Sequence, residues 1–393
     1  MPTFRFKQSR PVISSQIDEL NAFAQAKLDK LAAKDLKRGL VPTTRGVGCS
    51  VVRDGEAAIS FCDNDYLGLS QNPRVVAAAG AAAIRHGAGA GASRLVSGDS
   101  PLNHELESMI AQIKGTEACR VFGSGYMANL GAVPCLVGDK DLIVMDELSH
   151  ACMRAAAQLS GAEVRMFRHN DVADARAQLA NGPEHGRILL MTETVFSMDG
   201  DLAPLQELQA LCEKFGAWMM TDDAHGFGVI KQENPALIQM GTLSKAVGVY
   251  GGYVCGPAAF VELMISRART LVFTTGLPPQ VLGAAVEAVS IIRDDTQLAK
   301  DVMSKTTAFT NALGLPKPSS TIVPILLGEA SVALDVQAKL LEDGFHVSAI
   351  RPPTVPEGSS RLRVAFSAAH ELDDVLALAE SLKKHLPKDV LEK

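Results

Sequence analysis

Short apolar segments recur along the chain beyond Phe61, and Ala/Leu-rich stretches of helical character alternate with them. Seven of the apolar segments have the character of buried strands, and they cover residues 120–122, 142–146, 164–167, 188–193, 217–222, 238–241 and 250–255. Such an alternation predicts a mostly parallel sheet with crossover helices. We therefore expect an α/β fold built on a seven-stranded central sheet.

An amphipathic pattern precedes this region. Residues 15–38 place apolar side chains at helical spacing between charged ones, and Gly39 with Pro42 ends the run. This spacing predicts an N-terminal helix.

The pattern changes again after residue 279. It predicts a long helix over 280–294, then further helices and two strands over 321–327 and 361–366. The expected parts are a helical arm over 1–60, a large α/β domain over 61–290 and a smaller C-terminal α+β domain over 291–393.

Composition narrows the classes of function. The 393 residues are 47% hydrophobic and 21% charged, which is typical of a globular protein. A net charge of −6, with no Lys/Arg run longer than a pair, argues against nucleic acid and anionic membranes as partners. The apolar run 75–84 is shorter than the roughly 18 residues of a membrane span, and residues 1–10 lack the apolar core of a secretion signal, so we expect a cytoplasmic protein. Seven cysteines without a C-x-x-C pair argue against a disulfide framework or a thiolate metal site.

Polar residues end several of the predicted strands. Asp146, Glu193 and Asp222 each close an apolar run and lead into a loop. Open α/β sheets bind ligands beyond the carboxyl ends of their strands, so these positions are the first place to look for a site.

Two segments carry the strongest chemical signal, Thr-Asp-Asp-Ala-His-Gly at 221–226 and Gly-Thr-Leu-Ser-Lys-Ala at 241–246. A buried carboxylate needs a cation or strong donors, and the protonated ring nitrogen of pyridoxal 5'-phosphate is such a partner for Asp222. His225 could reach the phenolic oxygen of the ring, while Lys245 suits a Schiff base with the aldehyde. A lone lysine is usually a surface residue and Asp-Ala-His could cap a helix, but the combination favours a pyridoxal phosphate site.

Other candidates follow two of the remaining predicted strands. The Gly-rich residues 122–129 follow a strand and open a helix, so their backbone N–H groups could bind a phosphate. His150 comes shortly after Asp146, where its ring could lie on a planar cofactor, although a lone histidine is more often a structural group. The Gly-Ala run at 87–92 superficially matches a dinucleotide fingerprint, but it follows a helical stretch rather than a strand, and we reject it as a nicotinamide site.

Taken together, these segments resemble the α-oxoamine synthases, a branch of the fold-type I pyridoxal phosphate enzymes. The matching motifs span nearly the whole chain and lie at 64–69, 91–95, 125–126, 146–150, 193–200, 222–226 and Lys245. The resemblance implies the fold-type I architecture and a homodimer with shared active sites. Residues 349–356, with 361–363, are more similar to the alanine-using member of the biotin pathway than to the glycine-using members.

The resemblance also implies roles for individual residues in the cofactor site. Catalytic roles are implied for His150, Asp222, His225 and Lys245. Cofactor contacts are implied for Gly125 and Tyr126 at the phosphate turn, His150 on the ring face, Ser197, Asp222 and His225 around the ring, Thr242 at the phosphate, Lys245 at the aldehyde carbon, and Thr274 or Thr275 at the phosphate bound by the other subunit.

Substrate contacts are implied by the same resemblance. Arg363 would bind the carboxylate of the amino acid, and Asn64 and Thr354 would lie near the substrate. The N-terminal arginine that contacts the substrate is either Arg38 or Arg45.

The implied reaction is a decarboxylative condensation of L-alanine with a pimeloyl thioester of coenzyme A or of an acyl-carrier protein. A glycine-using synthase that takes acetyl-CoA or succinyl-CoA is the nearest alternative. A catalytically silent binding protein of the same fold is another, and the joint presence of Asp222, His225 and Lys245 speaks against it. The loop after Val229 is shorter than is usual in the family, which leaves its contacts with the acyl substrate open.

Overall fold

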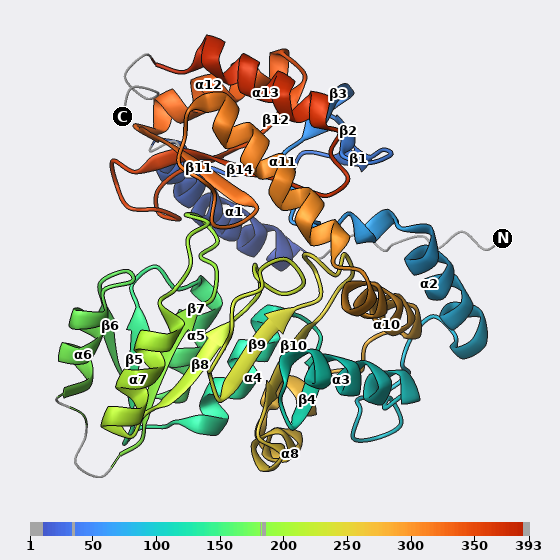
Figure 1. The fold of residues 1–393 in the computed structure, drawn as a ribbon, viewed down its shortest axis with the longest axis vertical. Helices are drawn as coiled ribbons and strands as arrows, with labels where there is room; N and C mark the ends of the chain where they lie inside the picture. The colour runs from blue at the N-terminus through green and yellow to red at the C-terminus, as the bar shows by residue number, and fades with distance from the viewer. Residues whose placement is uncertain (1–10, 34–35, 181, 183–185, 388–393) are drawn as a thin grey trace. The chain divides into compact units, whose positions relative to one another are not determined.

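A seven-stranded sheet forms the centre of the computed structural model, which describes residues 11–33, 36–180, 182 and 186–387. Its spatial order is β4-β10-β9-β8-β7-β5-β6. The strands are β4 (Ala118–Phe122), β5 (Leu142–Asp146), β6 (Glu163–Phe167), β7 (Ile188–Glu193), β8 (Trp218–Asp222), β9 (Ile238–Thr242) and β10 (Gly252–Gly256). Strand β10 runs antiparallel to both neighbours, and the remaining pairs are parallel, so the predicted fold class is confirmed (Figure 1).

The register of the parallel strands brings their polar ends to one edge. Glu193 at the end of β7 pairs with Asp222 at the end of β8, and Asp222 pairs with Met240 of β9. Since these strands share one direction, the polar ends meet where the sheet meets the loops that follow it.

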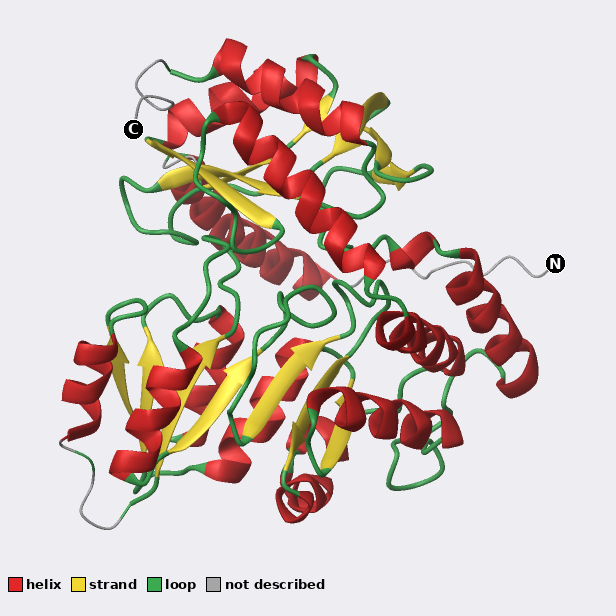
Figure 2. Cartoon of the chain, in the orientation of Figure 1, coloured by secondary structure: helices red, strands yellow, loops and turns green. Residues whose placement is uncertain are grey.

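Helices cover both faces of this sheet (Figure 2). Successive residues of β5 alternate between two separate cores, with Ile143 and Met145 in one and Leu142 and Val144 in the other. This explains the unbroken apolar runs, because a strand buried on both faces has no solvent side. One face is covered by α4 (Gly125–Leu136), α5 (Ala151–Ser160), α8 (Ala258–Arg267) and α9 (Arg269–Val272), the other by α6 (Val172–Ala180) and α7 (Leu205–Phe215).

Three further helices pack together beside β4 and β10, and their ends follow ordinary capping rules. They are α2 (Pro73–His86), which follows the 3-10 turn η1 (Leu69–Gln71), α3 (Pro101–Lys114) and α10 (Pro279–Asp294). The Asn72 side chain accepts the Arg74 N–H and the Ser100 side chain accepts the Leu102 N–H, and each cap is followed by proline at the first helical position. Helix α10 begins one residue before the predicted long helix and ends at the predicted Asp294.

The C-terminal part is α+β, as predicted. Strands β11 (Ile322–Gly328), β14 (Ser360–Ala365) and β13 (Ser348–Ile350) form an antiparallel sheet in that order. Strand β12 (Phe345–His346) pairs in parallel with β3 (Glu56–Ser60). The helices of this part are α11 (Gln297–Leu313), α12 (Ala330–Glu342) and α13 (Leu372–His385). The domain limits at 60/61 and 290/291 stay predictions.

The N-terminal helix α1 spans Pro11–Ala32, so the predicted limits 15–38 are wrong at both ends. Proline is favoured at a helix start. At the other end, the N–H of Leu36 donates to the carbonyl of Leu31, five residues earlier, at 2.8 Å, whereas an α-helical bond joins residues four apart. The chain continues with the short strands β1 (Thr43–Arg45) and β2 (Ser50–Arg53). Within the described residues, none of the helices is both long and apolar enough to cross a membrane.

Candidate active site

A cavity of about 170 Å³ lies at the carboxyl ends of β7, β8 and β9. It is lined by Ser124, Gly125, Tyr126, His150, Cys152, Glu193, Asp222, Ala224, His225, Met240, Thr242, Ser244 and Lys245. The fold thus brings the amine of Lys245 together with six other residues that the sequence predicted for one site.

Asp222 ends β8 inside this cavity and is 4% exposed. One carboxylate oxygen accepts the side-chain N–H of Asn129 at 2.9 Å, and the other accepts the backbone N–H of Ala224 at 3.0 Å. Among the described residues, no lysine or arginine comes within ion-pair distance of it. A buried carboxylate with neutral donors alone retains the capacity to accept a cationic N–H.

The start of α4 forms one end of the cavity. The Ser124 side chain caps the helix by accepting the Met127 N–H at 3.2 Å. A Cβ on Gly125 would meet Met240 at 3.0 Å and Thr242 at 3.3 Å, and a Cβ on Gly252 would lie 2.5 Å from the Gly125 nitrogen. The glycines therefore leave the first turn of the helix open, and free N–H groups there favour a phosphate.

Lys245 lies three residues beyond the end of β9 and is half-buried. Burial lowers the pKa of its amine, although the charges of Asp222 and Glu193 act in the opposite direction. A lowered pKa raises the fraction of neutral amine, which is the nucleophilic form.

His150 is fixed as the N-cap of α5. Its Nδ1 accepts the backbone N–H of Cys152 at 3.2 Å and lies 2.8 Å from the thiol of the same residue. The backbone N–H of His150 donates to Glu193 Oε1 at 2.7 Å. Burial lowers the pKa of His150, which favours the neutral ring, and the proton lies on Nε2 because Nδ1 accepts the Cys152 N–H. The side chain lines the cavity.

Arg363 reaches His225 through Tyr66. The Tyr66 hydroxyl lies 2.6 Å from His225 Nδ1, and Arg363 donates to that hydroxyl at 3.2 Å. Arg363 also donates to Asn64 Oδ1 at 3.1 Å and to the Ser197 carbonyl at 2.5 Å. Burial, together with the charges of Lys245 and Arg363, places the pKa of His225 well below its usual range, so this ring is neutral.

The two arginines of β14 have different partners. Arg361 forms an ion pair with Asp199, whereas Arg363 has only neutral acceptors among the described residues. Arg363 is 5% exposed, and a buried guanidinium without a carboxylate is suited to bind one from a ligand.

Several predicted residues lie elsewhere. Thr274 and Thr275 line a separate small cavity beside Arg94. Thr354 lies in the loop between β13 and β14, where its N–H donates to the Arg351 carbonyl at 3.0 Å. Arg38 is exposed within the N-terminal unit that comprises the described residues of 1–44 and 52–56.

Arg45, the alternative to Arg38, has partners that the structure identifies. It donates to Ser70 Oγ at 2.9 Å and lies 3.4 Å from an Asp65 carboxylate oxygen. A role of either arginine toward a substrate stays a prediction.

Sequence reasoning assigned no role to Cys152 and Glu193, which line the cavity, or to Asn129, which contacts Asp222. Asn129 joins Asp222 to the Cys152 thiol, since its Nδ2 lies 2.9 Å from Asp222 Oδ2 and 3.1 Å from Cys152 Sγ. Burial and the charge of Asp222 raise the pKa of Glu193 to about 8. Glu193 was marked only as a strand end and Asn129 only as part of the Gly-rich segment, because a sequence pattern does not show which side chains face each other.

The chain is similar to known proteins along most of its length. A family model described as aminotransferase class I and II matches residues 56–382. An 8-amino-7-oxononanoate synthase of Methylobacterium radiotolerans is 56% identical over 367 residues, which are 93% of this chain and 98% of that protein.

The chain is also similar in fold to solved structures. A structure of SPT with a PLP internal aldimine has a TM-score of 0.86 and 29% identity, covering 94% of this chain and 98% of that one. An 8-amino-7-oxononanoate synthase from Francisella tularensis has a TM-score of 0.71 and 26% identity, covering 83% and 97%.

Proposed function

The chain belongs to the aminotransferase class I and II family, and we propose that it is a pyridoxal 5'-phosphate-dependent acyltransferase with 8-amino-7-oxononanoate synthase activity. The reaction condenses L-alanine with a pimeloyl thioester and releases carbon dioxide and the free thiol, as a step of biotin biosynthesis. The observation that carries the proposal is the cavity in which Lys245 meets an unpaired buried carboxylate, Asp222, and the open first turn of α4.

The residues of the cavity fit pyridoxal phosphate. Asp222 would accept the N–H of the ring nitrogen, and the first turn of α4 with the Thr242 hydroxyl would bind the phosphate. The neutral ring of His150 would lie on the cofactor ring, and His225 would contact its edge. When bound, the cofactor supplies an electron sink for cleavage of the bonds at the amino-acid Cα.

The remaining chemistry falls to side chains of this chain. Lys245 Nζ would bind the aldehyde carbon of the cofactor and, once displaced by the amino acid, take the proton from its Cα. The lowered pKa of Lys245 supports this second role, because a neutral amine accepts a proton.

Arg363 would bind the alanine carboxylate. Its present acceptors are the hydroxyl of Tyr66, the amide oxygen of Asn64 and the carbonyl of Ser197, none of which carries a charge. Two parallel hydrogen bonds to a carboxylate would also fix which Cα bond stands perpendicular to the cofactor ring.

The assembly and location belong to the same proposal. We place Thr274 or Thr275 near the cofactor phosphate of a second subunit, so that a homodimer has shared active sites. The separate cavity at Thr274, away from Lys245 in the same chain, supports that arrangement. We also propose a cytoplasmic location.

A second candidate follows from the solved structures. Two solved structures named as serine palmitoyltransferases each have a TM-score of 0.85, above the 0.71 of the Francisella tularensis synthase, which favours a serine- and palmitoyl-using enzyme. Sequence points the other way, since 8-amino-7-oxononanoate synthases reach 56% identity and the serine palmitoyltransferases 28%. We therefore put alanine and the pimeloyl donor first.

A substrate panel tests the proposal. Purified protein with pyridoxal phosphate is given alanine, glycine or serine, each with pimeloyl-CoA, pimeloyl-carrier protein, acetyl-CoA, succinyl-CoA or palmitoyl-CoA, and products are detected by mass. We expect 8-amino-7-oxononanoate from alanine with a pimeloyl donor. A preference for serine with palmitoyl-CoA, or for glycine with a short acyl-CoA, would overturn the assignment.

A further inference from the structure

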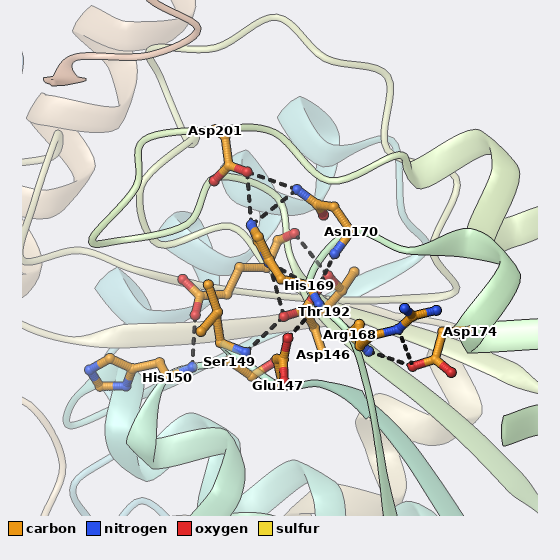
Figure 3. Close-up of polar contacts among 12 residues, drawn as sticks. Asp146, Glu147, Ser149, His150, Arg168, His169, Asn170, Asp174, Thr192 and Asp201 are labelled. Carbon is orange, nitrogen blue, oxygen red and sulfur yellow. Dashed lines mark hydrogen bonds and ion pairs between the residues drawn. The ribbon is translucent and has the colours of Figure 1, made fainter. Parts of the chain in front are cut away.

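His169, just beyond the end of β6, lies between two carboxylates. Its Nδ1 is 3.1 Å from an Asp146 oxygen and its Nε2 is 2.8 Å from an Asp201 oxygen (Figure 3). Since an ionised carboxylate only accepts hydrogen bonds, both ring nitrogens carry protons and the ring is a cation. Burial opposes this charge, but the hydrogen bonds with Asp146 and Asp201 outweigh it and raise the pKa of His169 to about 10.

One partner of His169 shapes the turn that leads to His150. Asp146 is fully buried, and its carboxylate also accepts the N–H of Leu148 at 2.8 Å and that of Asn170 at 2.9 Å. Its carbonyl accepts the N–H of Ser149 at 3.1 Å. His150, the residue that faces the cofactor cavity, follows directly, so the position of Asp146 sets the path of the backbone into α5.

The other partner belongs to the turn that contacts Arg363. Residues 195–202 form a tight turn in which Phe196 N–H donates to the Asp201 carbonyl at 3.0 Å. The Ser197 carbonyl of this turn accepts from Arg363 Nε at 2.5 Å. The Asp201 side chain of the same turn contacts His169 Nε2, and the side-chain amide of Asn170 donates to it at 2.9 Å.

We propose that His169 is a positioning residue that joins these two turns through its two ring N–H groups, and thereby aligns His150 and Arg363 for the cofactor and the amino-acid substrate. It touches neither ligand, because it is absent from the lining of the cofactor cavity. The inference rests on the proposed function for the role of Arg363, but its effect on His150 concerns cofactor binding alone.

The other neighbours of His169 are compatible with its contacts to Asp146 and Asp201. Glu147 accepts the backbone N–H of His169 at 3.0 Å, and the ring meets the edge of Phe196 at 4.4 Å between centroids. The neighbouring Arg168 pairs with Asp171 and Asp174 on its own segment, outside both turns. Arg168→Gln is therefore a matched control: it removes a charge next to His169 without touching either turn.

The principal test compares His169→Gln with Arg168→Gln and wild type. Glutamine is uncharged and carries both of its donors on one nitrogen, so it cannot bridge the two carboxylates as the two ring nitrogens of His169 do. We therefore expect the dissociation constant for pyridoxal phosphate and the KM for alanine each to rise about tenfold or more, the order that misplacing reactive groups produces. The KM for the pimeloyl donor should change less than about twofold, because neither turn is assigned to it. Arg168→Gln should match wild type in all three.

A second variant guards against loss of folding in His169→Gln. Asp201→Asn keeps the size of the side chain but removes one carboxylate, so the pKa of His169 should fall toward its ordinary value of 6.5. The KM for alanine should then rise with pH through neutrality in Asp201→Asn, and stay flat over that range in wild type.

The outcomes separate the two proposals. If folded His169→Gln binds cofactor and alanine as wild type does, or if Asp201→Asn shows no new pH dependence, the positioning role is wrong and His169 is a structural ion pair. If wild type fails to use alanine, the proposed function fails, whereas the cofactor affinities of the variants still decide the effect on His150.

Discussion

Asn129 shows how a single buried side chain can connect the groups around a cofactor. Its amide donates to Asp222 and lies within reach of the Cys152 thiol, which in turn lies 2.8 Å from His150. Asp222 and His150 are therefore oriented by the same short chain of contacts inside the fold. The amide oxygen of Asn129 is buried and has no hydrogen-bond partner among the described residues.

Lys245→Ala should abolish turnover, because no other described lysine lines the cavity to bind the aldehyde carbon. The fold should persist, since Lys245 is half-buried and its amine forms no ion pair with any of the residues that the structure describes. Borohydride treatment with mass analysis should trap cofactor on Lys245 of wild type and on no lysine of the variant. Trapping at another lysine would show that the cofactor attachment site is misassigned.

Asp222→Asn should leave the carboxamide in the same packing but remove the charge opposite the ring nitrogen. We expect turnover to fall by about a hundredfold or more, the order found when an electrostatic partner of a transition state is removed. Exchange of the alanine α-proton with solvent deuterium, followed by NMR, isolates this step from acyl transfer. Near-normal exchange in the variant would contradict the role given to Asp222.

Strand β14 carries two buried arginines, Arg361 and Arg363, to which we assign different roles. Arg363→Leu should raise the alanine requirement sharply with little effect on the pimeloyl donor, because it removes the guanidinium that has no carboxylate partner. Arg361→Leu should instead destabilise the fold by about 1.5–3 kcal/mol, because it removes a charge-assisted hydrogen bond to Asp199, whose side chain is 28% exposed. Alanine affinity measured from the cofactor absorbance without acyl donor, with thermal unfolding alongside, separates the two. The reverse pattern would move the carboxylate site to Arg361.

The close packing of β10 against the first turn of α4 can be tested by adding one methyl group to the strand. Gly252→Ala would place a Cβ 2.5 Å from the nitrogen of Gly125, forcing the first turn of α4 away from its position. We expect weaker binding of pyridoxal phosphate, by about tenfold or more, because the N–H groups assigned to the phosphate move. Gly80→Ala in α2 is the control, since nothing lies within 4 Å of its added Cβ, and it should bind cofactor normally.

The helices and strands differ in how well their limits and directions could be predicted from the sequence. Strands β5 and β7 have the predicted limits because each is an apolar run closed by a polar residue. The antiparallel direction of β10 was beyond prediction, since an apolar run has no direction. The end of α1 at Ala32 was missed because residues beyond it continue the helical spacing, and the bond from Leu36 to Leu31 leaves no mark in the sequence.

The site was predictable where one segment carries several of its residues. Residues 221–226 contain both Asp222 and His225, so this one segment predicts two residues of the site. The partners of His169 lie 23 and 32 positions away, and Asn129 lies 93 positions from Asp222. Only the sheet brings these pairs together, so local patterns could not assign them.

At the scale of the whole molecule, the raised pKa values of buried Glu193 and half-buried His169 couple stability to pH. Glu193 has its pKa raised from 4.5 to about 8, so the fold retains its proton where the unfolded chain loses it. This stabilisation is complete below about 4.5 and disappears as the pH rises through about 8. His169, raised from 6.5 to about 10, contributes fully below 6.5 and loses its contribution by about 10.

The contribution of Glu193 and His169 to the free energy of unfolding of the cofactor-free protein should therefore decrease as the pH rises from about 5 to about 10, while the lowered pKa values of His150, His225 and Lys245 act in the opposite direction. Glu193→Gln should flatten the lower part of this curve and His169→Gln the upper part. Denaturant unfolding at a series of pH values measures both. A slope between pH 5 and 8 that is the same in Glu193→Gln as in wild type would contradict the raised pKa of Glu193.

The reversed strand β10 also has a consequence for the order in which the chain can fold. Strand β4, which leads into the first turn of α4, pairs with β10 through contacts such as Phe122 with Gly252. During synthesis the ribosome must release more than a hundred further residues before that pairing can form, and such long closures slow folding. We expect the parallel strands β5 to β9 to assemble first, so that a nascent chain truncated before β10 has most of the sheet but cannot yet retain the cofactor.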